Sequence, residues 1–303
     1  MFTHYITVEP LYCQMRRFPK DFEGSARDLG CQWAPSEWSR RMTQPTDTQQ
    51  TRPLVNPPLY DLSTADAVSW LRGQPSASVD LLVTDPAYES LEKHRAVGTT
   101  TRLKHSKASS NDWFRVFPNE RFGELFAEVF RVLKPDTHFY LFCDAETMFV
   151  AKPEAERAGF KFWKPLVWDK RTIGMGYHYR ARYEFILFFE KGKRRLHDLG
   201  IADIIEEPRI RGGYPAEKPW KVSKVLIEQS SNPDDIVADP FMGSGSVGVA
   251  ALESGRKFIG ADLNPGAVRH TADRLKTYGP GNAPTDLPPA DQASLLAMLG
   301  SET

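Results

Sequence analysis

The sequence predicts an α/β fold, with a mostly parallel sheet and helices on both of its faces. Short apolar runs alternate along the chain with segments in which apolar residues recur every three or four positions, as strands alternate with amphipathic helices. The chain has 303 residues and is 41% hydrophobic, which is enough for a large buried core. The formal net charge is zero, so composition alone indicates no polyanionic partner.

The first half of the predicted sheet comes from four apolar runs and one periodic segment. VDLLVTD at 79–85 is almost continuously apolar, as in a strand buried on both faces. ERFGELFAEVFRVLK at 120–134 spaces its apolar residues by three and four, which predicts a helix. Strands are predicted from aromatic and aliphatic runs in THFYLFCD at 137–144, FKFWKPLVWDK at 160–170 and YEFILFFEKG at 183–192.

The second half consists of two predicted helices, each followed by a strand. PWKVSKVLIEQS at 219–230 has helical spacing and precedes the apolar run DIVADPF at 235–241. GSVGVAALESG at 245–255 predicts a helix between glycines, and KFIGADL at 257–263 predicts the last strand. Ligands of such sheets bind at the carboxyl ends of the strands, so the residues after each strand are the candidate site.

The two ends of the chain lack this alternation. Residues 1–52 mix proline, polar residues and scattered aromatics, which predicts an N-terminal arm or linker. Residues 278–303 are rich in proline and glycine, which predicts a C-terminal tail. Residues 53–277 between them form the predicted domain.

No apolar run approaches the roughly 20 residues of a membrane helix, and no signal peptide is recognisable. We therefore expect a cytoplasmic protein without a membrane partner. Cys13, Cys31 and Cys143 form no CxxC pair, and the histidines have no ligand spacing with cysteine or carboxylates. We expect reduced structural thiols and no metal site.

A glycine-rich turn between the strand at 235–241 and the helix at 245–255 predicts a nucleoside site. Gly243 and Gly245 allow a tight turn, and Asp262 follows about 20 positions later, where an acidic residue can hold ribose hydroxyls. Together with Gly248 the glycines also match GxGxxG, so NAD is an open alternative. Asp239 would repel a pyrophosphate but could receive an ammonium group, which favours S-adenosylmethionine.

The segment Asp85-Pro86-Ala87-Tyr88 ends the first predicted strand. Asp85 offers a hydrogen-bond acceptor, Pro86 a carbonyl without a competing N–H, and Tyr88 a flat stacking face. Together they suit a planar ligand that carries an amino group. An ordinary Asp-Pro turn at a strand end is the structural alternative.

DPAY at 85–88, PFMGSG at 240–245 and the order of these motifs resemble the β group of the DNA amino-methyltransferases, which modify adenine-N6 or cytosine-N4. The resemblance extends from about Leu59 to Leu275. It implies a Rossmann-like, S-adenosylmethionine-dependent methyltransferase fold with permuted motif order, and a methyltransferase domain at 53–277. It implies catalytic residues Asp85, Pro86 and Tyr88, and cofactor-binding residues Asp66, Lys218, Asp239, Phe241, Gly243, Ser244, Gly245 and Asp262.

The family pattern has a second proline where this chain has Ala87. A second proline would restrict ψ of Pro86 and so aim its carbonyl. The other groups remain, so we interpret the site as competent. Asp85 favours adenine, because cytosine-N4 members more often begin this motif with serine. A cytosine-N4 or RNA adenine methyltransferase, and an inactive nucleic-acid-binding relative, stay open.

The resemblance implies double-stranded DNA as partner, with the target base flipped into the site, and leaves monomer and homodimer open. Residues 161–224 contain 15 Lys and Arg against 8 Asp and Glu, as a phosphate-binding face would. A target-recognition region maps to 191–213, and the polar segment 89–113 is expected to close over DNA or the base. The predicted DNA contacts are Lys170, Arg171, Arg180, Arg182, Lys193, Arg194, Arg195, Arg209 and Arg211.

Overall fold

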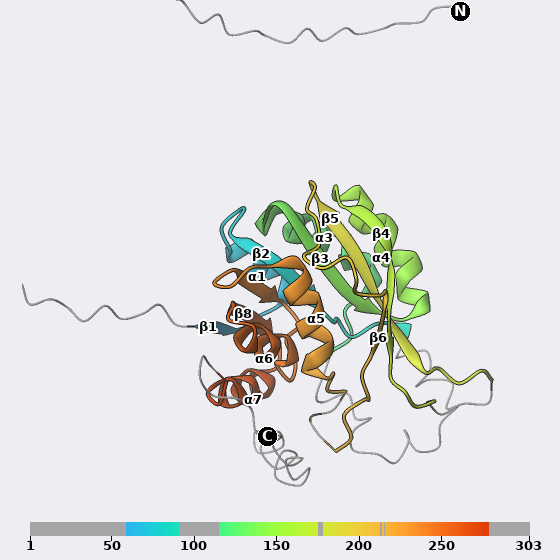
Figure 1. The fold of residues 1–303 in the computed structure, drawn as a ribbon. Coiled ribbons are helices and arrows are strands. Elements are labelled where there is room, and N and C mark those ends of the chain that lie inside the picture. Colours follow the sequence, from blue (N-terminus) through green and yellow to red (C-terminus); the bar gives the residue numbers. More distant parts are fainter. Residues whose placement is uncertain (1–58, 91–114, 175–177, 213, 215, 279–303) are drawn as a thin grey trace, which may run out of the picture. The chain divides into compact units, whose positions relative to one another are not determined.

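The fold is that of a computed structural model, which describes residues 59–90, 115–174, 178–212, 214 and 216–278 (Figure 1). The predicted arm at 1–52 and nearly all of the tail at 278–303 lie outside these residues. Most of the predicted closing segment at 89–113 lies outside them as well. The proposed boundaries of the methyltransferase domain therefore stay predictions.

One sheet of eight strands forms the centre of the described structure (Figure 1). Its order is β1-β8-β7-β2-β3-β5-β4-β6, and only the pairs β3/β5 and β5/β4 are antiparallel among these strands. The prediction of a mostly parallel sheet is confirmed. The strands are β1 (Tyr60–Thr64), β2 (Val79–Thr84), β3 (Leu133–Cys143), β4 (Lys161–Asp169), β5 (Tyr183–Lys191), β6 (Ile204–Glu206), β7 (Ile236–Asp239) and β8 (Lys257–Asp262).

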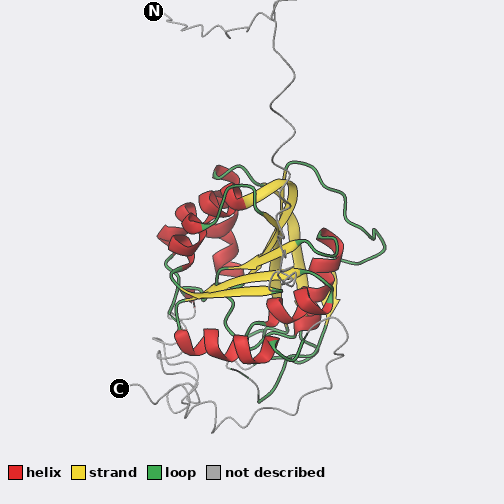
Figure 2. Ribbon diagram, turned by 90° about the vertical axis from the view of Figure 1, so that its left-hand side faces the viewer, coloured by secondary structure: helices red, strands yellow, loops and turns green. Residues whose placement is uncertain are grey.

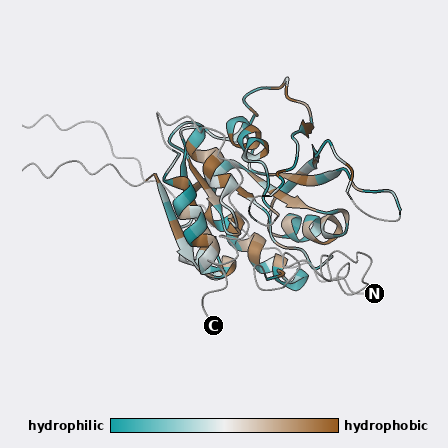
Figure 3. Cartoon of the chain, turned by 90° about the horizontal axis from the view of Figure 1, so that it is seen from below, coloured by the Kyte–Doolittle hydropathy of each residue, from teal (hydrophilic) through white to brown (hydrophobic). Residues whose placement is uncertain are grey.

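Helices cover both faces of the sheet (Figure 2). Buried side chains of β2 alternate between the faces: Leu82 packs in the cluster with α1, α3 and α4, whereas Leu81 and Val83 pack in the cluster with α5, α6 and α7. Hydrophobic residues line the central strands and the helix faces turned toward them (Figure 3). The helices are α1 (Ala67–Gly73), the 3₁₀ turn η2 (Asn119–Arg121), α3 (Phe122–Val132), α4 (Ala145–Arg157), α5 (Trp220–Ser230), α6 (Ser246–Glu253) and α7 (Pro265–Leu275).

All nine predicted elements are present; besides the short turn η2 at the start of the predicted helix 120–134, five further elements occur among the described residues that the sequence pattern did not predict. The strands β1 and β6 are too short and mixed to give a period-2 signal. In α4 an internal proline, Pro153, and few buried residues obscure the helical pattern. The start of α7 could have been predicted from the sequence, because Asn264 caps the helix and Pro265 occupies its first turn. The remaining unpredicted element is α1.

The order of the strands reverses between β7 and β2, which are neighbours in the sheet. From β7 the chain runs through α6 to β8 on one side, and from β2 it runs through α3 to β3 on the other. The two helices pack on opposite faces, so the carboxyl ends of β7 and β2 mark the topological switch point, where sheets of this kind bind their ligands. Both predicted motifs begin there.

Candidate active site

A buried hydrogen bond joins the two motifs at the switch point. Thr84, the last residue of β2, donates from Oγ1 to Oδ1 of Asp239, the last residue of β7, at 2.6 Å. The same Oδ1 accepts the Phe241 N–H at 3.0 Å. Within the described residues, Oδ2 of Asp239 has no hydrogen-bond partner. Burial raises the pKa of Asp239 to about 7, against the effect of its two neutral donors.

The glycine turn after β7 is held from two sides. Gly243 and Gly245 have φ of 49° and 76°, which glycine adopts without strain. The Gly243 N–H donates to Asp262 Oδ2 at 3.0 Å, and burial raises the pKa of Asp262. From α7, Thr271 donates to the Gly243 carbonyl and Arg274 to the carbonyl of Ser244, both at 2.9 Å. The turn is therefore a rigid backbone cradle.

Gly245→Ala should destabilise the protein by about 3 kcal/mol, measured by urea unfolding. A methyl group there would lie 2.5 Å from Thr271 Cγ2, and a positive φ costs alanine a further 1–2 kcal/mol or so. Gly255→Ala is the matched control, because Gly255 has a similar φ of 72° and open space around it. We expect that variant to lose only about 1 kcal/mol.

The double variant Gly245→Ala, Thr271→Ser should recover part of the loss, since serine lacks the clashing methyl and keeps the hydroxyl that holds Gly243. Equal destabilisation at Gly245 and Gly255 would mean that the close approach of α7 does not constrain the turn.

The strand-end motif presents an acceptor and a carbonyl. Asp85 accepts the Tyr88 hydroxyl at Oδ1, at 2.5 Å, and pairs with Lys218 Nζ at Oδ2, at 2.7 Å. The N–H of Phe117 donates to the Ala87 carbonyl at 2.8 Å, which restrains the chain where the family has its second proline. No donor among the described residues bonds the Pro86 carbonyl. Capacity for an amino group therefore remains, since a carboxylate can accept about four bonds.

Lys218 belongs to a network of half-buried charges next to Asp85. Its ammonium also pairs with Glu184 Oε2 at 2.7 Å, and Lys170 pairs with the other oxygen of Glu184 at 2.5 Å. Burial alone would raise the pKa of Glu184, but the two lysines lower it to about 2. Burial, opposed by Lys218 and reinforced by Glu184, raises the pKa of Asp85. Sequence reasoning missed Glu184, whose one signal is a charge inside the apolar run YEFILFF.

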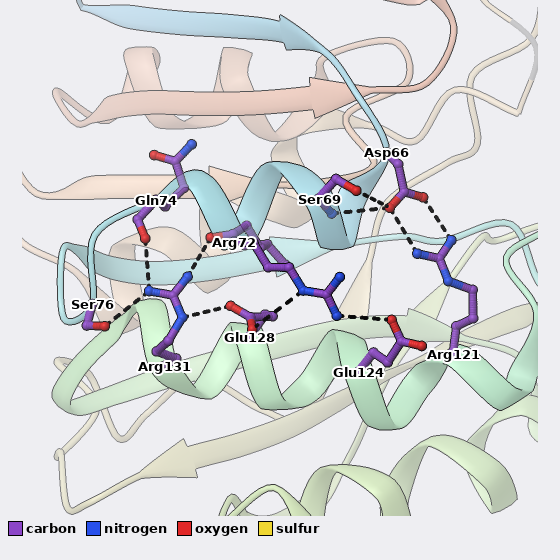
Figure 4. A network of polar contacts seen from close by, with 10 residues as sticks. Asp66, Ser69, Arg72, Gln74, Ser76, Arg121, Glu124, Glu128 and Arg131 are labelled. Carbon is purple, nitrogen blue, oxygen red and sulfur yellow. Dashed lines mark hydrogen bonds and ion pairs between the residues drawn. The ribbon is translucent and has the colours of Figure 1, made fainter.

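Most predicted cofactor residues lie around the switch point. Asp239, Phe241, Gly243, Ser244, Gly245 and Asp262 form or flank the cradle. Asp66 lies at the start of α1, where it caps Ser69 N–H at 3.2 Å and pairs with Arg121 at 2.8 and 2.9 Å (Figure 4). Arg121 lowers the pKa of Asp66 to about 2. This carboxylate thus joins α1 to the η2–α3 segment.

Two predicted residues pair with Glu184 in this structure. The Lys218 side chain, predicted to bind the cofactor, contacts Asp85 and Glu184. The Lys170 side chain, predicted to bind DNA, contacts Glu184. Both roles stay predictions. Tyr88 is 8% exposed and donates its hydroxyl to Asp85, so its stacking on a base stays a prediction.

The predicted DNA contacts divide between the two ends of the strands: the carboxyl ends of the parallel strands, where the site lies, and the opposite ends. Lys193, Arg194 and Arg195 follow β5, which runs antiparallel to β3, and the Arg194 carbonyl contacts His138 near the start of the β3 pairing. They therefore lie at the edge opposite the site. Five arginines lie at the site's edge: Arg171, paired with Glu206; Arg182, bonded to Asp169 at 2.6 and 2.7 Å; and the exposed Arg180, Arg209 and Arg211.

The described residues contain no group of three or more His, Cys, Asp or Glu placed to hold a metal. Cys143 is a buried free thiol at the end of β3, and burial raises its pKa beyond the range of a reactive thiolate. In the same part of the chain, no helix is long and apolar enough to cross a membrane.

The fold is that of the Rossmann-like methyltransferases, with the glycine cradle after β7 and the Asp-Pro-Ala-Tyr motif after β2. A profile of the DNA methylase family matches residues 79–209 and 197–273. The chain therefore belongs to this family, the adenine-N6 and cytosine-N4 methyltransferases of DNA.

Bacterial DNA methyltransferases are similar to this chain in sequence. The DNA adenine methyltransferase YhdJ of Escherichia coli K12 is 28% identical over 249 residues, covering 69% of this chain and 80% of YhdJ. The type II methyltransferase M.HpaI of Haemophilus parainfluenzae is 24% identical, covering 70% and 72%.

Two solved structures share the fold. M1.HpyAVI, solved as a complex with S-adenosylmethionine, has a TM-score of 0.54 and 22% identity, covering 71% of this chain and all of M1.HpyAVI. The cytosine-N4-specific PvuII methyltransferase has a TM-score of 0.57 and 16% identity, covering 80% and 93%.

Proposed function

We propose that this protein transfers a methyl group from S-adenosylmethionine to adenine-N6 in DNA. One observation carries the proposal. The Thr84–Asp239 hydrogen bond fixes the amino-accepting motif and the glycine cradle next to each other, at the carboxyl ends of adjacent strands. An amino nitrogen held by the first motif would lie beside a cofactor held by the second, as a direct transfer requires.

The residues present fit the proposed cofactor. Among the described residues, Oδ2 of Asp239 is an acceptor without a hydrogen-bond donor, and only neutral groups donate to Oδ1. A buried carboxylate of this kind suits the ammonium of a methionine moiety. Gly243 leaves room for close approach of a ligand, because a side chain there would meet nothing closer than the Phe241 carbonyl at 3.9 Å, and Asp262 keeps lone pairs for ribose hydroxyls. When bound, S-adenosylmethionine supplies a methyl group on a sulfonium whose leaving group is a neutral thioether.

The chain's own residues supply positioning and proton acceptance. A flipped adenine would donate its two amino hydrogens to Asp85 and to the Pro86 carbonyl. These acceptors direct the amino lone pair out of the plane of the base. As the nitrogen gains its fourth substituent it becomes cationic, and the Asp85 carboxylate stabilises that charge and accepts the proton. The Ala87–Phe117 hydrogen bond holds the Pro86 carbonyl in place without a second proline.

DNA would approach the edge of the sheet that carries the site. Arg180, Arg209 and Arg211 are exposed there and can reach phosphates. We leave Lys193, Arg194 and Arg195 out of this surface, because they lie at the opposite edge. The target-recognition region proposed at 191–213 then contributes mainly its second half, after β6.

Adenine is the proposed base because the acceptor at position 85 is aspartate. The test is to incubate the protein with duplex DNA and labelled S-adenosylmethionine, digest the DNA and identify the modified nucleoside by mass spectrometry. We expect N6-methyladenine from DNA and none from RNA of the same sequence. Detection of N4-methylcytosine in DNA would show that cytosine is the substrate, and detection of methylated adenine in RNA would show that RNA is the substrate; either result would contradict the proposal. No product from any substrate would favour the inactive relative.

A further inference from the structure

Glu184 has no assigned role in the site described so far, although it lies half-buried beside Asp85. It lies on β5, one residue after the strand begins, at the same edge of the sheet as Asp85. Its carboxylate joins Lys170 and Lys218 through separate oxygens. A glutamate in this position is not needed to close the sheet, because its neighbours Phe185 and Ile186 supply the apolar packing.

Lys218 contacts two carboxylates at the same distance. Its Nζ lies 2.7 Å from Asp85 Oδ2 and 2.7 Å from Glu184 Oε2. The ammonium also lies over two aromatic rings: its Nζ is 5.2 Å from the ring centroid of Phe142 and 5.7 Å from that of Trp168. The positive charge of Lys218 is therefore shared between two carboxylates, so it stabilises the negative charge of Asp85 less than a lysine paired with Asp85 alone would.

We infer that Glu184 is a positioning residue for methyl transfer: by sharing Lys218 with Asp85 and adding a second negative charge, it keeps the Asp85 carboxylate a strong acceptor for the amino proton. This inference rests on the proposed function, since it assigns Asp85 the acceptor role. Glu184 acts through Lys218 and the electrostatic field, without contact to a substrate.

The electrostatics of the site support this role. Burial raises the pKa of Asp85, Lys218 opposes that rise, and the charge of Glu184 adds to it. A carboxylate with a raised pKa is the stronger base, and general-base efficiency rises with basicity while the base remains ionised. The charged and titratable groups that face Asp85 are Tyr88 on its own loop, Lys218 before α5, Glu184 on β5, Cys143 at the end of β3 and Asp239 at the end of β7.

Glu184→Gln tests the inference without changing the shape of the side chain. With the charge gone, Lys218 compensates Asp85 alone, so the pKa of Asp85 falls. At saturating DNA and S-adenosylmethionine, the acid limb of the kcat–pH profile should shift to lower pH, and the plateau kcat should fall about tenfold. KM for either substrate should change little. A merely structural role would lower the plateau without moving the acid limb.

Lys170→Gln is the second variant, and its expected shift has the opposite sign. Lys170 does not contact Asp85, but it compensates Glu184. Without Lys170, the charge of Glu184 is compensated mainly by Lys218, which then stabilises the Asp85 carboxylate less. The pKa of Asp85 should rise, so the acid limb should move to higher pH. Glu184→Asp, which retains the charge, should restore much of the wild-type profile.

A direct readout separates this inference from the proposed function. The ¹³C carboxyl resonance of Asp85, assigned through its loss in Asp85→Asn, reports the protonation of Asp85 whether or not methyl transfer occurs. It should titrate at lower pH in Glu184→Gln and at higher pH in Lys170→Gln than in the wild type. Unchanged titration in both folded variants would overturn the inference, even if the protein methylates adenine. Shifted titrations in a protein inactive on every substrate would leave the charge network established and the proposed function wrong.

Discussion

Asp85→Asn should lower kcat for methyl transfer about 10³-fold. The variant keeps an oxygen that can face Lys218 but loses the negative charge, and it places an amide donor where the amino group of the base needs an acceptor. Removal of a general base or of one transition-state hydrogen bond typically costs 10² to 10⁴ or so in rate. Affinity for S-adenosylmethionine should stay within about threefold of wild type, because Asp85 lies outside the cradle at 239–245. Single-turnover kinetics and calorimetry measure the two quantities.

The matched control is Asp144→Asn. Asp144 follows β3 at the same edge of the sheet, where it caps α4 through the Thr147 N–H at 2.8 Å. Asparagine is an equally good cap, and its amide group can still hydrogen-bond the Ser90 hydroxyl that the other oxygen of Asp144 contacts. The variant therefore removes a nearby carboxylate without disturbing the helix. We expect it to keep nearly full activity. If Asp85→Asn retained even a tenth of the wild-type rate, the amino-acceptor role of the strand-end motif would be wrong.

The sequence predicted the centre of this fold better than its periphery, for a physical reason. Strands buried on both faces, such as β2, give continuous apolar runs, and amphipathic helices such as α3 give a clear period. Three-residue β6 gives neither. Its position follows only from pairing with β4, which is a property of the assembled sheet.

The site shows the same division between local and long-range information. The motifs at Asp85 and Gly243 could be identified from neighbouring residues, because each is one strand end and its turn. The Thr84–Asp239 bond could not, since it joins residues 155 positions apart and depends on the order of the strands. The ion pair between Glu184 and Lys218 also depends on β5 running antiparallel to β3, which brings the first residues of β5 to the end of the sheet where Asp85 lies.

The basic segment at 161–224 shows the limit of counting charges. It is basic in sequence, but the chain crosses the sheet along β5, so Lys193 and Arg209 lie at opposite edges. Lys170 is committed to Glu184. A count of charges along the chain gives no information on the direction of the strands. It could therefore not distinguish basic residues near the site from those at the opposite ends of the strands.

Asp239→Asn should weaken binding of S-adenosylmethionine about 100-fold while leaving the fold intact. Oδ1 accepts both protein hydrogen bonds, from Thr84 and from the Phe241 N–H, and an asparagine can keep both. The substitution changes only the other terminal atom, from a carboxylate oxygen that accepts no hydrogen bond from the described residues to an NH₂ donor that would face the ammonium of the ligand. Loss of a charge-assisted hydrogen bond in a buried site costs roughly 2–3 kcal/mol. Calorimetry measures the affinity, and thermal unfolding checks the fold.

The pH dependence of the wild type provides a stricter test of the same contact. The folded-state pKa of Asp239, about 7, lies above its unfolded value, so in the ligand-free protein the carboxyl is protonated below pH 7. Binding an ammonium requires the carboxylate, so the affinity should fall as the pH decreases below about 7, by up to about tenfold per pH unit. It should fall again above about pH 8, where the α-amino group of the ligand loses its proton.

The acid limb of this affinity profile should be absent in Asp239→Asn. Calorimetry at pH 6 in buffers of different ionisation enthalpy should show that the wild type releases a proton on binding and that the variant does not. Equal proton release by both proteins would assign the titration to another group, such as Asp85 or Asp262, because burial raises the pKa of both carboxyls. An unchanged affinity in Asp239→Asn would mean that the ammonium of the cofactor lies elsewhere, and that the free oxygen of Asp239 serves only the turn that follows β7.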